Sequence, residues 1–311
     1  MRIAVFGAGG IGGYLGARLN EVGEELIIIA RGEHLTVIQE KGLKIESPKG
    51  NFIAHPQIAT DDPRQVGEVD AILLGVKAWQ IPEVTHALRP MLGPDTAVIT
   101  LQNGVDTPSK VAAIVGAEHV VIGLAIVRCF IVKPGHLRHT VDLDPNVQIG
   151  EMERQSNERV KLLSQIFKKA RLSVRMPEDI HAAMWAKFFL MSVMSAMGTV
   201  TRTTTEVWRS IPETRKMTEL VLSEAARVAK THGVKLSDEI VENTMNLIDT
   251  MADGHMTSVA NDIIEKRPSE LESVIGYLVR LGKELGIDTP VTSFIYNTLL
   301  PQELTTRSQF D

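Results

Sequence analysis

The sequence predicts an α/β protein with a doubly wound N-terminal domain followed by an all-helical C-terminal domain. As far as residue 176, short apolar runs of strand length alternate with helical patterns, which favours βαβ units and a mostly parallel sheet. From residue 177 the pattern is helical almost to the end. The 311 residues are enough for two domains with separate cores. We therefore expect one domain over residues 1–176 and another over residues 177–311.

Composition narrows the classes of partner and compartment. The formal net charge of −5 provides no basic field that would attract nucleic acid or an anionic membrane, so we expect neither partner. Cys129 is the single cysteine, which excludes an intramolecular disulfide and a cysteine-based zinc site and is typical of a reducing cytoplasm. A strand pattern begins at Arg2, and no apolar run approaches the ~18 residues of a membrane span. We expect a soluble cytoplasmic protein.

The first turn of the chain carries the strongest motif. A buried-strand pattern at Arg2–Phe6 is followed by glycines at the G-x-G-x-x-G spacing and then by a helical pattern. In such turns Gly7 permits the tight bend, Gly9 lets the backbone approach a pyrophosphate, and Gly12 lets the helix lie close to the strand. Glycine-rich turns also occur for steric reasons alone, but the strand-to-helix context favours a dinucleotide site. The residues expected to meet the dinucleotide are Gly7, Ala8, Gly9, Gly10, Ile11 and Gly12.

The end of the second strand pattern indicates which dinucleotide is bound. Glu25–Ala30 is apolar without alternation, as a strand covered on both faces is, and Arg31 follows it. An acid at this place accepts a hydrogen bond from the ribose 2′-OH of NAD, whereas an arginine accommodates the 2′-phosphate of NADP. Arg31 therefore predicts NADP. The alternatives are that Arg31 closes a surface loop and that Glu33 reaches a ribose.

Two more loops follow strand patterns at residues 71–75 and 96–100, and they carry Lys77 and Asn103. Ligands of open α/β sheets bind at this carboxyl edge. Lys77 could meet a phosphate or ribose, or could be a solvated lysine that opens a helix. Asn103 precedes Gly104, and because Asn-Gly is a common turn dipeptide, the residues alone favour a turn there. Extended pieces between 120 and 150 predict an antiparallel edge of the sheet, before a helix at 157–169 and a strand at 172–175.

The second domain begins with a segment that is apolar on every side. Residues 180–200 therefore predict a core helix, and Lys187 is its single charged residue. Burial would lower the pKa of this lysine toward the range useful for proton transfer. Alternatively, its stem packs while its amine reaches water. Further helices are predicted at residues 212–232, 238–253 and 268–285, with Gly286 and Pro290 ending the last.

Two polar residues lie near the start of that last predicted helix. Ser258 stands in a polar turn, for which a capping or loop role is the ordinary interpretation. Glu270 stands in a first helical turn, where the helix dipole favours an acid. From the residues alone, neither side chain is assigned a ligand.

Taken together, six segments resemble the ketopantoate reductase family of NADPH-dependent 2-dehydropantoate 2-reductases. The resemblance runs the full length of the chain and implies a Rossmann domain, an all-helical C-terminal domain, an active site in the cleft between them, and a place in pantothenate biosynthesis. Members often form dimers, so a homodimer is one assembly that it allows. The segments are Gly7–Gly13, Arg31, Val76–Gln80, Gln102–Val105, Trp185–Lys187 and Arg267–Glu272.

The resemblance also implies roles for single residues. Lys187 matches the family's catalytic lysine, and Asn103 matches an asparagine near the nicotinamide ribose and the substrate. Ser258 matches a serine that binds the substrate carboxylate, and Glu270 matches a glutamate that meets cofactor and substrate. The implied chemistry is hydride transfer from NADPH to a 2-oxo carbon, while Lys187 stabilises and protonates the developing alkoxide.

Three positions depart from the family's substrate-binding pattern. Met191, Ser195 and Thr205 stand where the resemblance places asparagines, so the resemblance still implies reduction of a 2-oxo acid but no longer points to ketopantoate alone. A 2-oxo acid reductase with ketopantoate as the first substrate to try is the leading hypothesis. The alternatives are a reductase of the same fold for a more apolar oxo compound and a non-catalytic NADP-binding sensor. Lys187 and Glu270 argue against the sensor, because a sensor does not need a desolvated lysine.

Overall fold

The computed structural model describes residues 1–142, 144–153 and 156–309. The chain divides into two compact units. The first comprises Met1–Gln102 and Asp106–Ile180, and the second comprises Asn103–Val105 and His181–Asp311. The division after Ile180 lies close to the expected one after residue 176, and the short segment Asn103–Val105 is grouped with the helices.

The first unit contains an eight-stranded sheet in the order β12-β11-β8-β7-β6-β1-β2-β5. β1 lies parallel to β2 on one side and to β6 on the other, and β7 and β8 continue the parallel order. β11 runs antiparallel to β8, and β12 at the edge lies parallel to β11, so the sheet has the antiparallel edge that the sequence predicts. The fold is thus of the predicted Rossmann type. The strands are β1 (Arg2–Phe6), β2 (Glu25–Ile29), β5 (Ile58–Thr60), β6 (Val69–Leu74), β7 (Leu92–Thr100), β8 (Val120–Ile126), β11 (Asn146–Glu151) and β12 (Ser173–Arg175).

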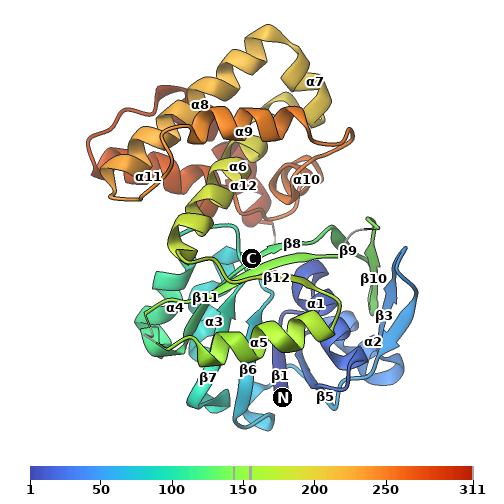
Figure 1. Cartoon of the computed structure of the whole chain (residues 1–311). Coiled ribbons are helices and arrows are strands. Elements are labelled where there is room, and N and C mark those ends of the chain that lie inside the picture. Colours follow the sequence, from blue (N-terminus) through green and yellow to red (C-terminus); the bar gives the residue numbers. More distant parts are fainter. Residues whose placement is uncertain (143, 154–155, 310–311) are drawn as a thin grey trace. The chain divides into compact units, whose positions relative to one another are not determined.

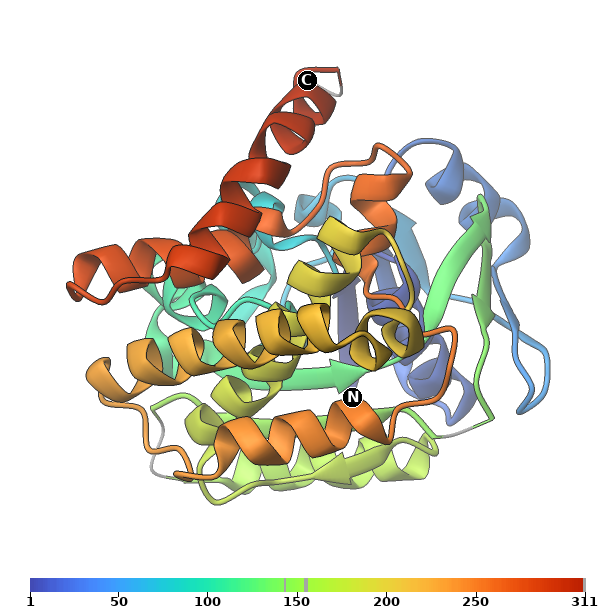
Figure 2. The same ribbon diagram turned by 90° about the horizontal axis from the view of Figure 1, so that it is seen from above.

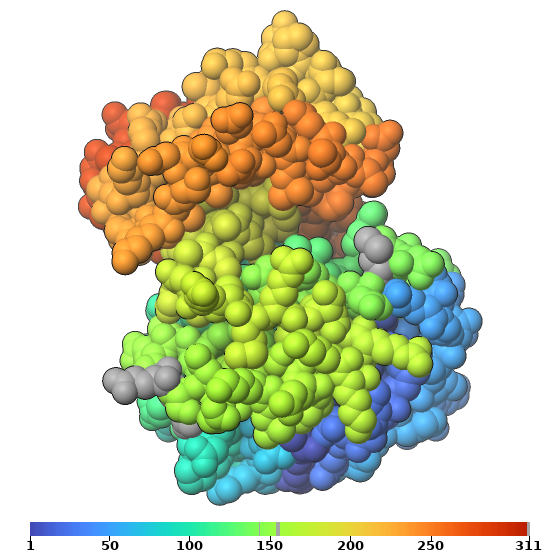
Figure 3. Space-filling view, viewed as in Figure 1, coloured from blue at the N-terminus to red at the C-terminus, as the bar shows by residue number. Residues whose placement is uncertain are grey.

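Helices cover both faces of this sheet because successive residues of its strands point to opposite sides. In β1, Ile3 and Val5 join one core cluster with residues of α1 and α5, whereas Ala4 joins another with residues of α3 and α4. α5 lies across one face (Figure 1), and in the space-filling view the yellow-green residues cover this face of the unit (Figure 3). The helices are α1 (Gly10–Glu21), α2 (Gly32–Lys41), α3 (Ile81–Ala87), α4 (Thr107–Val115) and α5 (Glu158–Lys169).

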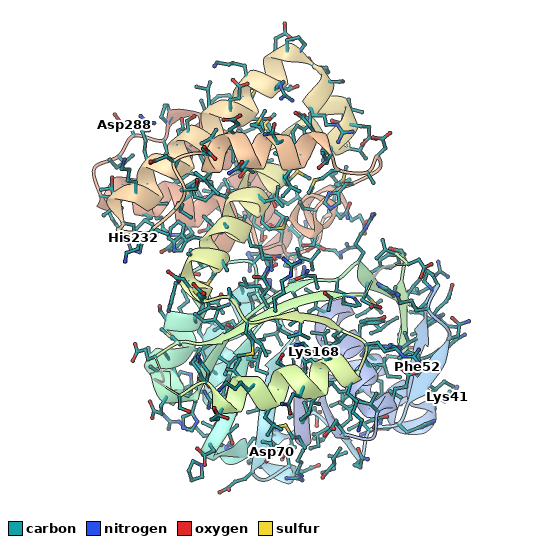
Figure 4. The ribbon with its side chains drawn as sticks, viewed as in Figure 1. Lys41, Phe52, Asp70, Lys168, His232 and Asp288 are labelled. Atoms are coloured by element: carbon teal, nitrogen blue, oxygen red, sulfur yellow. The ribbon has the colours of Figure 1, made fainter. Side chains whose placement is uncertain are left out.

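A second, four-stranded sheet in the order β4-β3-β10-β9 differs from the expectation. Its strands are β3 (Leu43–Glu46), β4 (Phe52–Ala54), β9 (Cys129–Lys133) and β10 (His136–His139). β9 and β10 were expected at the edge of the main sheet, but β10 pairs in parallel with β3, a partner distant in sequence. Phe52 of β4 is labelled in Figure 4. The Arg18 guanidinium of α1 lies over its ring, 5.6 Å from the ring centre, and this contact joins the second sheet to α1.

In the second unit, all regular elements among the described residues are helices. α8 and α9 lie side by side (Figure 2). The helices predicted at 180–200, 212–232 and 238–253 are present, and the one predicted at 268–285 begins as a π-helix. The elements are α6 (Ile180–Thr201), α7 (Thr205–Ser210), α8 (Pro212–Thr231), α9 (Ile240–Asp249), α10 (Ser258–Ile264), η5 (Glu272–Gly276), α11 (Tyr277–Glu284) and α12 (Pro290–Arg307).

Two boundaries in this unit correct the prediction. Residues 258–264 form α10, although they were expected in a polar turn. Gly286 does follow the end of α11, with a φ of 68° that glycine adopts readily. Pro290, however, opens α12, because a proline at the first helical position has no N–H to leave unsatisfied.

The expectation that no apolar run is long enough to span a membrane is also wrong. α6 is 22 residues long and, by length and composition alone, could cross a bilayer. One such helix is weak evidence for a span, and 67% of its most apolar window is buried inside the fold. This burial is typical of the core helix that the sequence predicts.

Candidate active site

The glycine turn follows β1 at the point where the strand order reverses. β1 has β2 on one side and β6 on the other, and the chain extends the sheet first in one direction and then in the other. Ligands of open α/β sheets bind outside the carboxyl ends of the strands at such a switch point. The turn and the start of α1 therefore stand where a dinucleotide phosphate is expected.

The glycines of the turn are needed for different physical reasons. Gly7 has a φ of 94°, and a Cβ there would lie 2.7 Å from Val76 Cγ1. A Cβ on Gly12 would lie 2.5 Å from the Gly7 carbonyl oxygen, so only glycine lets α1 start this close to β1. At Gly9 the nearest atom would be the Gly75 oxygen at 3.8 Å, an ordinary contact. The protein's own packing thus does not require Gly9 to be glycine, which fits a backbone that a pyrophosphate approaches.

Gly10 and Gly75 extend this glycine arrangement. A Cβ on Gly10 would lie 2.0 Å from the Cys129 carbonyl oxygen, so β9 approaches the first turn of α1 closely. A Cβ on Gly75, at the end of β6, would lie 2.3 Å from the Gly7 carbonyl oxygen. Sequence reasoning missed Gly75, because it lies outside the G-x-G-x-x-G spacing. Its position directly after a strand pattern was the one available signal.

His34 on α2 forms a hydrogen bond with the backbone of the glycine turn. Its Nε2 lies 3.0 Å from the Ala8 carbonyl oxygen, and the Gly135 N–H donates to its Nδ1 at 3.1 Å. A carbonyl can only accept and an amide N–H can only donate, so the ring is neutral with its hydrogen on Nε2. Burial lowers the pKa of His34, which favours the same neutral form. The sequence carries no motif that would have identified this histidine.

Arg31 and Lys77 lie at the carboxyl ends of β2 and β6. Arg31 is exposed and precedes α2 as its N-cap residue, and Glu33 is exposed in the first turn of that helix. Lys77 is half-buried, and its backbone N–H donates to the Gln80 side chain at 3.1 Å. Gln102 fixes this loop, because its Nε2 donates to the carbonyl oxygens of Leu74 and Val76 at 2.8 and 2.9 Å. Gln102 therefore positions this loop, a role that its place in the motif Gln102–Val105 does not indicate.

The second unit brings together Lys187, Glu270 and Asn103. Lys187 lies on α6, and its Nζ is buried with no hydrogen-bond partner among the described residues, although the residue as a whole is only half-buried. The amine therefore does not reach water, and the alternative in which it does is wrong. Burial lowers the pKa of Lys187 to about 8, and the charge of Glu270 opposes this shift.

Glu270 is almost fully buried, with 6% of its surface exposed. The Asn103 amide donates to its carboxylate at a long 3.4 Å. A turn is therefore not the whole role of Asn103, because its side chain reaches an acid 167 residues away in the chain. An acid, an amide and a desolvated lysine form one cluster.

Ser258 is exposed at the first position of α10. The residue that caps this helix is Thr257, whose side chain accepts a hydrogen bond from the Ala260 N–H at 3.2 Å. The capping interpretation of Ser258 is therefore wrong by one residue. No group of three or more His, Cys, Asp or Glu side chains that could hold a metal ion occurs in the part of the chain that the structure describes.

Two family models match most of the chain. A model described as Ketopantoate reductase PanE/ApbA matches residues 3–154, and one described as Ketopantoate reductase PanE/ApbA C terminal matches residues 179–303. The chain belongs to the ketopantoate reductase family. The resemblance drawn from the sequence motifs is thereby confirmed, and the protein is an oxidoreductase of this family.

Individual relatives agree with this family. The 2-dehydropantoate 2-reductase of Mesorhizobium japonicum is 27% identical, over 93% of this chain and 94% of its own. A PanE/ApbA family ketopantoate reductase from Ralstonia eutropha has a TM-score of 0.88 at 26% identity, over 99% of this chain and 100% of its own. D-mandelate dehydrogenase, solved with NADH and anilino(oxo)acetate, has a TM-score of 0.90 at 23% identity, over 99% of each chain, and shares the fold.

The three positions at which this ketopantoate reductase family member lacks asparagines have different surroundings. Met191 is half-buried, one helical turn after Lys187 on α6, and Ser195 is buried one turn further. Thr205 is also buried, and both its N–H and its hydroxyl donate to the His255 carbonyl oxygen at 3.1 Å. The Thr205 hydroxyl is therefore already bonded to the protein's own backbone. Met191, by contrast, lies on the same face of α6 as Lys187.

Proposed function

We propose that the protein reduces a 2-oxo acid to a 2-hydroxy acid with NADPH, and that ketopantoate is the first substrate to test. The observation that carries this proposal is the buried Nζ of Lys187, which has no hydrogen-bond partner among the described residues and lies in one cluster with Glu270 and Asn103. Perturbed titratable groups of this kind concentrate at catalytic sites. Family membership supports the same class of reaction.

Lys187 is the proposed general acid. With a pKa of about 8, most Lys187 side chains carry the proton at pH 7, yet the proton is given up far more readily than from an ordinary lysine. Its Nζ stabilises negative charge on the substrate carbonyl oxygen and then donates its proton to that oxygen. Because the Lys187 ammonium is already desolvated, it can stabilise the negative charge on the substrate oxygen without first losing bound water.

Glu270 and Asn103 set the electrostatic and geometric conditions for this lysine. The negative charge of Glu270 favours the protonated form of Lys187, which keeps its pKa from falling further. The Asn103 amide, bonded to Glu270, presents a second polar group in the same cluster. For Ser258 we propose the role that the resemblance implies, which is to bind the substrate carboxylate with an exposed hydroxyl at a helix start.

The residues of the first unit fit a nicotinamide dinucleotide. Gly7, Gly9 and Gly12 form the cradle, and the first turn of α1 presents N–H groups to a pyrophosphate. Arg31 is exposed where the 2′-phosphate of NADP is expected, and Lys77 stands at the end of the neighbouring strand. When bound, the dinucleotide supplies the hydride that reduces the 2-oxo carbon.

A second candidate is a reductase of the same fold for a more apolar 2-oxo acid. Met191 favours it, because this methionine lies one turn from Lys187 where the resemblance places a substrate-binding amide. A thioether adapts its shape to apolar groups and offers only a weak acceptor to a hydroxyl. A cytoplasmic location and a homodimer remain expectations.

The test is an NADPH oxidation assay across a panel of 2-oxo acids that includes ketopantoate and plain branched-chain analogues. We expect turnover of at least one 2-oxo acid. The Lys187→Ala variant should bind NADPH normally and lose roughly 10²–10⁴ in kcat, the usual contribution of a general acid. If the intact protein binds NADPH but reduces none of the panel, the proposal fails in favour of the sensor.

A further inference from the structure

The position of Glu270 depends on an irregular segment. Between the end of α10 and the start of η5 the chain has no regular structure, and Lys266 has a φ of 54°, a left-handed conformation that side chains other than glycine rarely adopt. Glu270 lies in this segment, yet its carboxylate is buried beside Asn103. A buried acid on an irregular segment needs an anchor outside that segment.

The anchor is a carboxylate on the last helix. Glu303 of α12 is 1% exposed and accepts hydrogen bonds from the Ser269 N–H at 3.0 Å and from the Ser269 hydroxyl at 2.6 Å. Arg307, one turn later, lies with its Nε 2.7 Å from Glu303 and donates through Nη2 to the Ser269 carbonyl oxygen at 2.7 Å. Two ionised side chains therefore bond the N–H, the carbonyl and the hydroxyl of Ser269.

Further hydrogen bonds hold the backbone on both sides of Glu270. The Ser269 hydroxyl also accepts from the Leu271 N–H at 3.1 Å, and the N–H groups of Ser273 and Val274 both donate to the Glu270 carbonyl oxygen at 3.1 Å. The backbone on either side of Glu270 is thus bonded, first by Glu303 and then by the π-helix. π-Helical turns are frequent at functional sites.

We propose that Glu303 is a positioning residue, whose carboxylate holds Ser269 and thereby keeps the adjacent Glu270 in place beside Asn103 and near Lys187. This inference rests on the proposed function. Burying an ion pair is costly, and apolar residues would attach α12 to the core at least as well. A carboxylate differs from them in accepting two donors of one residue, through hydrogen bonds roughly twice as strong as neutral ones.

The chain offers a matched control. Glu224 on α8 is 3% exposed and accepts hydrogen bonds from the N–H groups of Val291 and Thr292, both at 2.9 Å, and from the Thr292 hydroxyl at 2.6 Å. It therefore resembles Glu303 in burial and in accepting backbone N–H and hydroxyl hydrogen bonds, but it bonds the first turn of α12. Glu224→Gln and Glu303→Gln should both lower the unfolding temperature.

Of these two glutamine variants, only Glu303→Gln should change the chemistry. We expect kcat for the 2-oxo acid to fall by about 10²-fold, the loss that a displacement of about 1 Å can cause. The alkaline limb of the kcat profile should also move to lower pH, because displaced Glu270 no longer supports the protonated form of Lys187. In the protein without cofactor, the titration of labelled Lys187 followed by NMR should move the same way. Ser269→Ala, which keeps the N–H bond to Glu303, should give the same changes at smaller size.

Two results would overturn the inference. One is an equal loss of kcat in Glu224→Gln and Glu303→Gln, which would make the role of Glu303 purely structural. The other is an unchanged Lys187 titration in Glu303→Gln and Ser269→Ala. If the intact protein reduces no 2-oxo acid, the proposed function fails, and the NMR titration still decides whether Glu303 controls the cluster around Lys187.

Discussion

Replacing Lys187 by methionine should stabilise the protein while it lowers kcat as strongly as Lys187→Ala does. Methionine has a similar length without the charge, and the position lies on an apolar helix with a buried Nζ. The pKa of Lys187 falls from 10.5 to about 8, which corresponds to roughly 3 kcal/mol of penalty on the charged form. Because the residue is half-buried, solvent reduces this figure, and we expect a gain of about 1–3 kcal/mol at pH 7.

The size of the stability gain from Lys187→Met depends on pH in a way that identifies its cause. The folded protein disfavours charged Lys187, so the penalty is fully present below pH 8 and disappears as pH rises from about 8 to 10.5. The gain from Lys187→Met should therefore be seen in thermal unfolding at pH 7 and should shrink at pH 10. Lys230→Met, at an exposed lysine of α8, is the control and should change stability little at either pH. A loss of stability at pH 7, or an equal gain at both pH values, would refute the reasoning.

Three further predictions concern the ligands. Arg31→Ala should weaken NADPH binding, measured by titration calorimetry, with little change for NADH, because only NADPH carries a 2′-phosphate; equal losses for both would show that Arg31 does not meet it. His34→Ala should raise the Kd for NADPH with little effect on kcat at saturation, since it releases the Ala8 carbonyl, and an unchanged Kd would contradict this role. Met191→Asn should raise kcat/KM for ketopantoate relative to 3-methyl-2-oxobutanoate, provided the amide is not left unsatisfied at a cost of about 1–3 kcal/mol. A parent that already prefers ketopantoate by about a thousandfold would argue against that reading.

The sequence by itself determined the elements whose signals are local. The strand, glycine turn and helix at the start of the chain are contiguous, so spacing alone predicted them. The apolar character of residues 180–200 predicted a core helix, and it also identified Lys187 as the unusual residue. The glycine roles could be assigned in advance because the fingerprint describes backbone contacts that any chain in this fold must make.

Tertiary structure decided what depends on residues far apart in the chain. The second sheet needs the pairing of β3 with β10, and no periodicity within either strand reveals its partner. The sequence alone did not show whether Pro290 ends one helix or begins the next, because this proline both follows α11 and opens α12. Whether the Lys187 amine is buried depends on the helices around α6, not on α6 alone. The hydrogen bonds from Ser269 to Glu303 link two segments more than 30 residues apart, and they form only once α12 packs against the irregular segment that precedes η5.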